Sequence, residues 1–209
     1  MKKRCLIVGA GEWTPIKTPV SEYGCIIAAD GGYARLKKEN ITPDIVLGDF
    51  DSLGFIPEEK NVIRYPSEKD APDMKIAVEL AYEKGYKIID IYGGTGGRFA
   101  HTLANIQNLA WLAERGVSAC MYGENFTASA LTCGKITFSE KEKGYISVFS
   151  LTEQSEGVCE KGLKYSLDNA VLRFDDPLGL SNEFTGRKAE ISVKKGILLI
   201  ITNNKNFKE

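Results

Sequence analysis

Residues 87–123 read KIIDIYGGTGGRFAHTLANIQNLAWLAERGVSACMYG, and the fold class can be predicted from this segment. A short apolar run at 87–93 leads through a glycine-rich turn into a helical pattern at 101–115, and a second apolar run follows at 118–123. Apolar side chains recur every three or four residues in the central part, which is typical of an amphipathic helix. Both flanking runs are almost continuously apolar, as strands covered on both faces are. The stretch therefore predicts a strand–helix–strand unit of a parallel sheet.

The same alternation extends back to the N-terminus. Further apolar runs occur at residues 5–10, 25–30, 44–49 and 61–65. Further helical patterns occur at residues 32–39 and 73–84, and a glycine follows the second, as it often does at the end of a helix. We predict that residues 1–123 form an α/β domain with a doubly wound, mostly parallel sheet.

From residue 124 onward the rhythm changes, because no helical pattern remains. Short β-type runs separated by Gly, Asp and Asn occur at residues 136–141, 145–151, 170–174, 189–193 and 197–202. The last two runs are joined by KKG, which predicts a hairpin that turns at Gly196. We predict that residues 124–209 form a separate all-β domain, a sandwich or a small barrel.

Composition excludes several classes of function. The 209 residues carry a formal net charge of −1, so no basic surface favours nucleic acid or an anionic membrane. The apolar run near the N-terminus is too short for a membrane span or a signal peptide. The five cysteines are odd in number, scattered and never in a CxxC pair, which favours reduced thiols in the cytoplasm. With His101 as the single histidine, a zinc site is not expected.

Acidic residues follow two of the predicted strands at their carboxyl ends, where open parallel sheets bind ligands. Asp30 follows the strand residues CIIAA at 25–29, and Asp49 and Asp51 follow DIVLG at 44–48. Aspartates in such a turn can simply bind nearby backbone amides. Because the pair lies at a strand's carboxyl end, we favour the other interpretation, a Mg²⁺ site completed by water and phosphate oxygens.

A second acidic pair, Asp70 and Asp73, brackets the start of the helix predicted at 73–84. One interpretation is structural: Asp70 caps the helix and Asp73 interacts with its dipole. The other is catalytic, with Lys69 beside them as a phosphate contact or as an ordinary surface lysine.

The loop GGTGGR at 93–98 opens a helix with an arginine. Glycines let backbone amides approach a phosphate, and Arg98 can add a charged contact. The alternative is a tight turn, but so many glycines exceed what a turn needs. His101 follows, either as a hydrogen-bonded structural residue or as part of this site.

Another glycine pair, in GAGEWT at 9–14, imitates a dinucleotide-binding fingerprint. Thr14 replaces its third glycine, and Pro15 disrupts the helix that would receive a pyrophosphate. We therefore do not predict NAD binding. In the β half, GLSNEF places Ser181 and Asn182 between apolar residues, either as a turn between strands or as a recognition site for a small organic ligand.

Taken in order, these motifs resemble those of bacterial thiamine pyrophosphokinases. The matching stretches are ADGGY, PDIVLGDFDS, GGTGGR-x-x-H-TLANIQ and PLGLSNEF, and the resemblance covers nearly the whole chain. It implies an α/β catalytic domain joined to a β-sandwich. It also implies transfer of the pyrophosphoryl group of ATP to the hydroxyl of thiamine, giving thiamine diphosphate and AMP. Members are homodimers with active sites at the subunit interface.

The resemblance also implies roles for individual residues. Asp49, Asp51 and Asp73 are similar in position to the Mg²⁺ ligands and, with Arg98, form the expected catalytic group. The positions expected around ATP and its phosphates are Asp30, Gly31, Lys69, Asp70, Gly96, Gly97, Arg98 and His101. Ser181 and Asn182 match positions that recognise thiamine.

Two positions depart from the family pattern. Ala100 stands where GGR-x-D-H has an aspartate, and alanine can neither bind metal nor accept a proton. Pro72 replaces a threonine in the acidic motif. Two other functions therefore stay open: a catalytically impaired homologue that binds thiamine or a nucleotide, and a Mg²⁺-dependent phosphohydrolase built on the aspartate pair.

Overall fold

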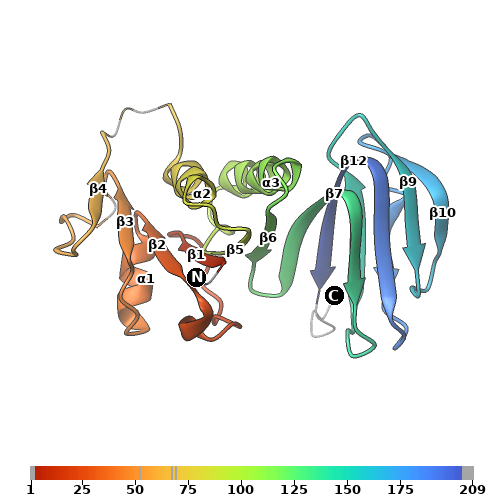
Figure 1. The fold of residues 1–209 in the computed structure, drawn as a ribbon, viewed down its shortest axis with the longest axis horizontal. Helices are drawn as coiled ribbons and strands as arrows, with labels where there is room; N and C mark the ends of the chain where they lie inside the picture. The colour runs from red at the N-terminus through yellow and green to blue at the C-terminus, as the bar shows by residue number, and fades with distance from the viewer. Residues whose placement is uncertain (1–2, 52, 67, 69, 204–209) are drawn as a thin grey trace. The chain divides into compact units, whose positions relative to one another are not determined.

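The computed structural model describes residues 3–51, 53–66, 68 and 70–203. The chain divides into two compact units (Figure 1). The first comprises Met1–Asn108 and Ala119–Glu124, and the second comprises Leu109–Ser118 and Asn125–Glu209. Within the described ranges, no helix is long and apolar enough to cross a membrane.

The first unit contains the predicted parallel sheet. Its strands lie in the order β6-β5-β1-β2-β3-β4. Their bounds are β1 Arg4–Val8, β2 Cys25–Ala29, β3 Ile45–Gly48, β4 Val62–Arg64, β5 Ile88–Tyr92 and β6 Ser118–Tyr122. Strand β1 pairs in parallel with β2 and β5, and β3 pairs in parallel with β2 and β4. All six apolar runs predicted as strands are confirmed.

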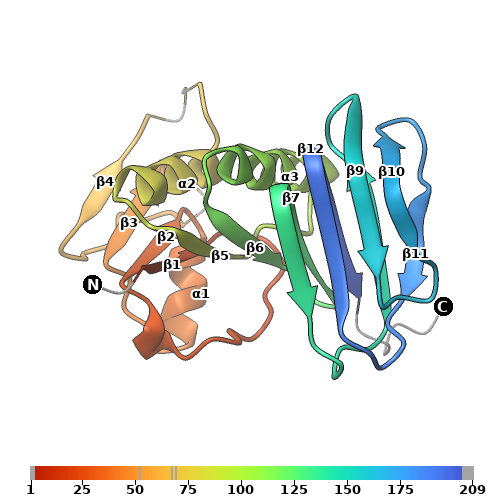
Figure 2. The same ribbon diagram turned by 45° about the vertical axis from the view of Figure 1, so that its right-hand side comes forward.

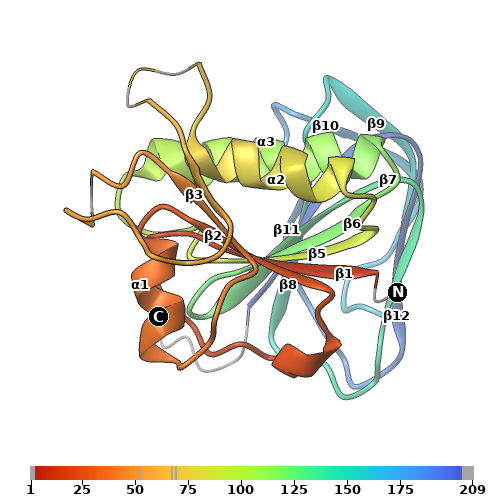
Figure 3. The same cartoon turned by 60° about the vertical axis from the view of Figure 1, so that its left-hand side comes forward.

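Helices cover both faces of this sheet, which explains why its central strands are apolar throughout. Helix α1, Gly32–Lys38, lies on one face (Figure 3). Helix α2, Asp73–Glu83, and the first half of α3, Phe99–Glu114, lie on the other (Figures 2 and 3). All five residues of β2 are buried, as is expected between two helical layers. A short 3₁₀ helix, Val20–Glu22, precedes β2.

The three predicted helices are confirmed, with one shifted start. Helix α3 begins at Phe99, two residues before the predicted His101, so Arg98 directly precedes it. Helices α2 and α3 are each followed by a glycine with positive φ, Gly85 at 82° and Gly116 at 68°. Such a residue ends a helix in the left-handed conformation, which favours glycine.

The second unit is the predicted all-β region. Its strands are β7 Phe126–Phe138, β8 Tyr145–Ser150, β9 Gln154–Lys161, β10 Leu167–Arg173, β11 Gly179–Glu183 and β12 Ala189–Asn203. They pair in the order β10-β9-β12-β7, and β8 pairs with β12 and β11. The pairings are antiparallel, and their inward side chains form an apolar core that includes Val158, Ile191 and Phe184.

The hairpin predicted at Gly196 is wrong, because residues 189–203 form one strand. Both halves of β12 pair with β7, and a register shift separates Val193 from Ile197. Gly196 has a φ of 93°, so it supplies a bulge and not a chain reversal. One half of β12 also pairs with β9 and the other with β8.

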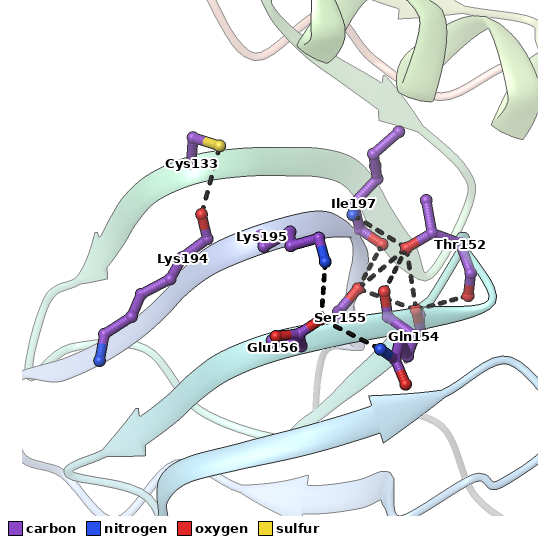
Figure 4. Close-up of polar contacts among 9 residues, drawn as sticks. Cys133, Thr152, Gln154, Ser155, Glu156, Lys194, Lys195 and Ile197 are labelled. Atoms are coloured by element: carbon purple, nitrogen blue, oxygen red, sulfur yellow. Dashed lines mark hydrogen bonds and ion pairs between the residues drawn. The ribbon is translucent and has the colours of Figure 1, made fainter.

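Side chains satisfy the backbone around this bulge (Figure 4). The Ile197 N–H donates to Thr152 Oγ1 at 3.3 Å, and Ser155 Oγ donates to the Ile197 carbonyl at 3.2 Å. Lys195 forms an ion pair with Glu156 of β9 at 2.9 Å. The bulge is therefore fixed by polar contacts with the β8–β9 turn and β9.

Candidate functional site

A cleft of about 710 Å³ opens in the first unit at the carboxyl ends of its parallel strands. It is lined by the residues that follow β1, β2, β3 and β5 and by the first turns of α2 and α3. Among the lining residues are seven sequence-predicted site residues: Asp30, Asp49, Asp51, Asp73, Gly96, Arg98 and His101. The expectation that these positions converge follows from parallel strands, whose carboxyl ends share one edge.

The other predicted site residues have different positions. Gly31 is the N-cap of α1, and Asp70 and Gly97 are exposed, but none of the three lines the cleft. Lys69 lies outside the described residues. Ser181 and Asn182 belong to β11 of the second unit.

The two aspartates after β3 are presented by the phenylalanine between them. Phe50 is 3% exposed and packs with Val46 and Leu6 in the core of the first unit. Its φ is 64°, a conformation that L-residues rarely adopt and that often marks functional turns. Asp49 is half-buried and Asp51 is exposed, and the Asp51 N–H donates to Asp49 Oδ1 at 3.2 Å. The buried ring thus anchors a turn that holds both carboxylates at the cleft.

The glycine-rich loop after β5 lies against the loop after β1. The Gly11 N–H donates to the Gly93 carbonyl at 2.9 Å, and the Glu12 N–H donates to the Thr95 carbonyl at 2.7 Å. A Cβ at Gly93 would lie 2.2 Å from the Gly9 carbonyl oxygen, so the two backbones touch. The glycines of GAGEWT are therefore needed for packing, a role that sequence reasoning missed.

Asn105 is a further residue that the sequence did not single out. It is 7% exposed and lines the cleft, and its Nδ2 donates to the Gly94 carbonyl at 2.7 Å. The side chain ties α3 to the glycine-rich loop. Its spacing was the available signal, because it follows His101 by four residues and so lies on the same helix face.

Helix α2 begins at Asp73, with Pro72 in the N-cap position and no side-chain cap. The interpretation of Asp70 as the N-cap is therefore wrong. Asp73 lies in the first turn, where the helix dipole favours a negative charge. Asp73 is half-buried and lines the cleft.

The charged lining of the cleft is mostly acidic. Four aspartates line it, and Arg98 is the guanidinium beside them. Across the described part of the chain, no three carboxylate, histidine or cysteine side chains are already gathered at metal-binding distance. Mg²⁺ takes one or two carboxylates and completes its shell with water and phosphate oxygens. The hard oxygen donors of Asp49, Asp51 and Asp73 therefore fit a Mg²⁺ ion that arrives with a phosphate substrate.

The second predicted site has a different character. Ser181 is exposed, has a φ of 58° and donates its N–H to Ser147 Oγ at 3.1 Å. Asn182 is 4% exposed and forms hydrogen bonds through both ends of its amide. The strand β11 carries a register shift between Gly179 and Asn182, which turns Ser181 outward.

Comparisons with known proteins assign families to both parts of the chain. Residues 17–121 match the family model described as thiamin pyrophosphokinase, catalytic domain. Residues 135–198 match the model described as thiamin pyrophosphokinase, vitamin B1 binding domain.

Individual relatives agree with these matches. The chain is 31% identical to thiamine pyrophosphokinase of Bacillus subtilis over 189 residues, which is 86% of this chain and 87% of the relative. A crystal structure of the Bacillus subtilis enzyme superposes with a TM-score of 0.83 and 28% identity, covering 97% of this chain and 99% of the other. That of thiamin pyrophosphokinase from Geobacillus thermodenitrificans gives 0.81 and 26%, covering 98% and 99%.

Proposed function

The chain belongs to the thiamin pyrophosphokinase family, and we therefore propose that it transfers the pyrophosphoryl group of ATP to the hydroxyl of thiamine, giving thiamine diphosphate and AMP. One observation carries the proposal. Four aspartates, Arg98 and a glycine-rich loop line one cleft, in the part of the chain that matches the catalytic domain. We expect the reaction to take place in the cytoplasm.

The two parts of the chain divide the work in this proposal. Residues 1–123 form the catalytic domain and bind ATP, and residues 124–209 bind thiamine. The match of residues 135–198 to the vitamin B1 binding domain supports the second assignment. Ser181 and Asn182 fall inside that match, and we assign both to thiamine recognition.

Asp49, Asp51 and Asp73 would hold Mg²⁺. When bound there, Mg²⁺ would neutralise charge on the triphosphate. The turn anchored by Phe50 and the first turn of α2 place these carboxylates along the same cleft.

The glycine-rich loop and the residues around it hold the phosphates. Backbone N–H groups at Gly96 and Gly97 approach phosphate oxygens, since neither residue has a side chain to block them. Arg98 donates charged hydrogen bonds from the cleft wall, and His101 contributes from the first turn of α3. From the resemblance of their motifs to those of the family, we assign Asp30 and Gly31 to the nucleotide and Lys69 and Asp70 to its phosphates.

In the reaction, the thiamine oxygen forms a bond to the β-phosphorus while the bond from that phosphorus to the AMP oxygen breaks. The hydroxyl proton passes to water in this step. Ala100 lines the cleft but can accept no proton, so the chain lacks a base at the position where the family has an aspartate. We therefore expect turnover in the unaltered chain to be slow.

We also propose that the protein is a homodimer with its active sites at the subunit interface. Large apolar side chains are exposed in the segment from residue 165 to residue 180, and exposed apolar side chains favour association where they gather on one surface. The most exposed are Tyr165 at 62%, Phe174 at 66%, Leu178 at 55% and Leu180 at 55%.

The test is an assay of the unaltered chain and of Ala100→Asp with thiamine, ATP and Mg²⁺, in which AMP and thiamine diphosphate are quantified together. We expect equal amounts of both products from the unaltered chain. We expect Ala100→Asp to raise kcat by about 10²–10⁴-fold, the usual contribution of a positioned general base. Ala104→Asp is the matched control, because Ala104 lines the same cleft one helical turn later.

The outcomes separate the alternatives. Products from Ala100→Asp alone would identify this chain as an impaired homologue with the fold of the kinase. Release of phosphate or AMP without thiamine diphosphate would favour a phosphohydrolase. A folded protein that yields nothing in either form would overturn the proposed function.

A further inference from the structure

Asn182 has no hydrogen-bonding capacity left for a ligand. Its Oδ1 accepts from the backbone N–H of Tyr165 at 3.0 Å and of Glu183 at 2.9 Å. Its Nδ2 donates to the Tyr165 carbonyl and to Glu160 Oε2, both at 2.7 Å. A carboxamide offers two donor hydrogens and two acceptor lone pairs. All four positions are therefore filled within the protein.

Glu160 is an unusual partner for this amide, because it is a carboxyl inside an apolar core. The side chain is 1% exposed on β9. Its cross-strand neighbours are Leu167 of β10 and Ile191 of β12. Asn182 donates to one oxygen, and Oε1 accepts no hydrogen bond from any described residue. A buried carboxyl with a single hydrogen-bond partner destabilises the fold. Its presence here therefore indicates a role other than stability.

The pair fixes two segments that carry exposed side chains. Through both backbone groups of Tyr165, Asn182 holds the bend between β9 and β10. Through its own place in β11, it fixes the chain next to the bulge at Ser181. Tyr165 and Ser181 are both exposed on these segments, whereas Glu160 and Asn182 are buried behind them.

We propose that Glu160 and Asn182 act together as positioning residues for thiamine recognition, and that neither touches thiamine. Glu160 orients the amide of Asn182, and the amide holds Tyr165 and Ser181 in place. The ligand contacts in this part of the protein come from the exposed residues that the pair supports. This inference rests on the proposed function and deepens it.

Glu160→Leu separates positioning from direct contact. Leucine suits the apolar core, so we expect this variant to fold, but it leaves one hydrogen of the Asn182 amide without an acceptor. A direct contact between Asn182 and thiamine would survive the change. Under the positioning role, KM for thiamine rises about tenfold, the scale of one lost hydrogen bond. The kcat and the KM for ATP stay unchanged.

Two further variants serve as controls, and a second readout does not depend on activity. Glu160→Gln keeps an acceptor for Asn182, so we expect it to retain the KM of the unaltered chain. Glu156→Gln changes an exposed carboxylate of the same strand and should also leave it unchanged. Hydrogen exchange at the Tyr165 and Glu183 amides should become faster in Glu160→Leu only.

Each result decides the matter. An unchanged KM for thiamine in Glu160→Leu, together with a raised KM in Asn182→Ala, would overturn the positioning role and make Asn182 a direct ligand. An unaltered protein that neither binds nor converts thiamine would overturn the proposed function instead. The exchange measurement then tests the positioning alone, and unchanged exchange in Glu160→Leu would overturn it.

Discussion

Among single residues, the buried carboxyl of Glu160 predicts a dependence of stability on pH. Burial raises the pKa of this group, and the hydrogen bond from Asn182 only partly offsets the effect. The groups packed on it from β10, β11 and β12 are Leu167, Asn182 and Ile191, none of which titrates. Lys161, the next residue of β9, is exposed.

The sign follows from the raised pKa. Below an unfolded-state pKa of about 4.3, Glu160 is protonated in both the folded and the unfolded protein, so its ionisation does not change the free energy of unfolding. As pH rises above that value, the unfolded state releases its proton first, so the folded state is progressively destabilised. We expect the difference in Tm between Glu160→Gln and the unaltered chain to shift in favour of Glu160→Gln as pH rises above about 4.3.

Glu156→Gln is the control, because its ion pair with Lys195 lowers the pKa of Glu156. The stabilising effect of that pair is present above the unfolded-state pKa and fades as pH falls, so this variant should show the opposite trend. Thermal unfolding at several pH values measures both. A Tm difference for Glu160→Gln that does not vary with pH would contradict the prediction.

The residues of the cleft divide into those that sequence could predict and those that it could not. Asp30, Asp49 and Asp51 follow strands, and the geometry of a parallel sheet brings such positions together. Asn105 acts through the Gly94 carbonyl, a contact that exists only after α3 has packed beside the loop. Sequence spacing gives the helix face of such a residue but not its partner.

Among the elements, the contact between the loop after β1 and the glycine-rich loop after β5 can be tested with two variants of the second loop. Gly93 and Gly97 both have a φ of 62°, so alanine meets the same backbone strain at either position, about 1–2 kcal/mol. At Gly93 the new Cβ would lie 2.2 Å from the Gly9 carbonyl oxygen, whereas nothing lies within 4 Å at Gly97. The difference between the variants therefore isolates the contact between the loops.

We expect Gly93→Ala to lower the free energy of unfolding by more than about 3 kcal/mol and Gly97→Ala by only the strain term. Urea unfolding of the two variants measures this difference. Equal losses would mean that the loops can separate without cost, and the packing role of Gly9 would be wrong.

The strands show why the β half was harder to predict than the α/β half. A parallel strand between two helical layers is apolar throughout, as β2 is, and all six strands of the parallel sheet were identified. Strand β9 has the sequence QSEGVCEK. It was not predicted from the sequence, because both its inward and its outward positions mix polar with apolar residues. The hairpin error at Gly196 has the same origin, since a glycine with positive φ serves a turn or a bulge equally well and only the pairing partner decides.

For the protein as a whole, the proposed dimer predicts that the unaltered chain and an interface variant differ in their mass in solution. We expect sedimentation of the unaltered chain to give a dimer. The double variant Phe174→Glu/Leu178→Glu should give a monomer, because it places charges on two of the most exposed apolar side chains. Val20→Glu, which changes an exposed apolar residue of the first unit, should remain dimeric. A monomer in the unaltered chain would contradict the proposal.

The pairing of β12 also bears on how the protein is made. Strand β12 is the last of the described elements to leave the ribosome, yet β7, β8 and β9 all pair with it. Until it emerges, each of these nascent strands keeps an open edge, and open edges promote aggregation. The α/β sheet up to β5 needs nothing from the C-terminal strands and can form earlier during translation. Slow synthesis over the final third of the message would therefore lengthen the period in which a chaperone must protect the chain.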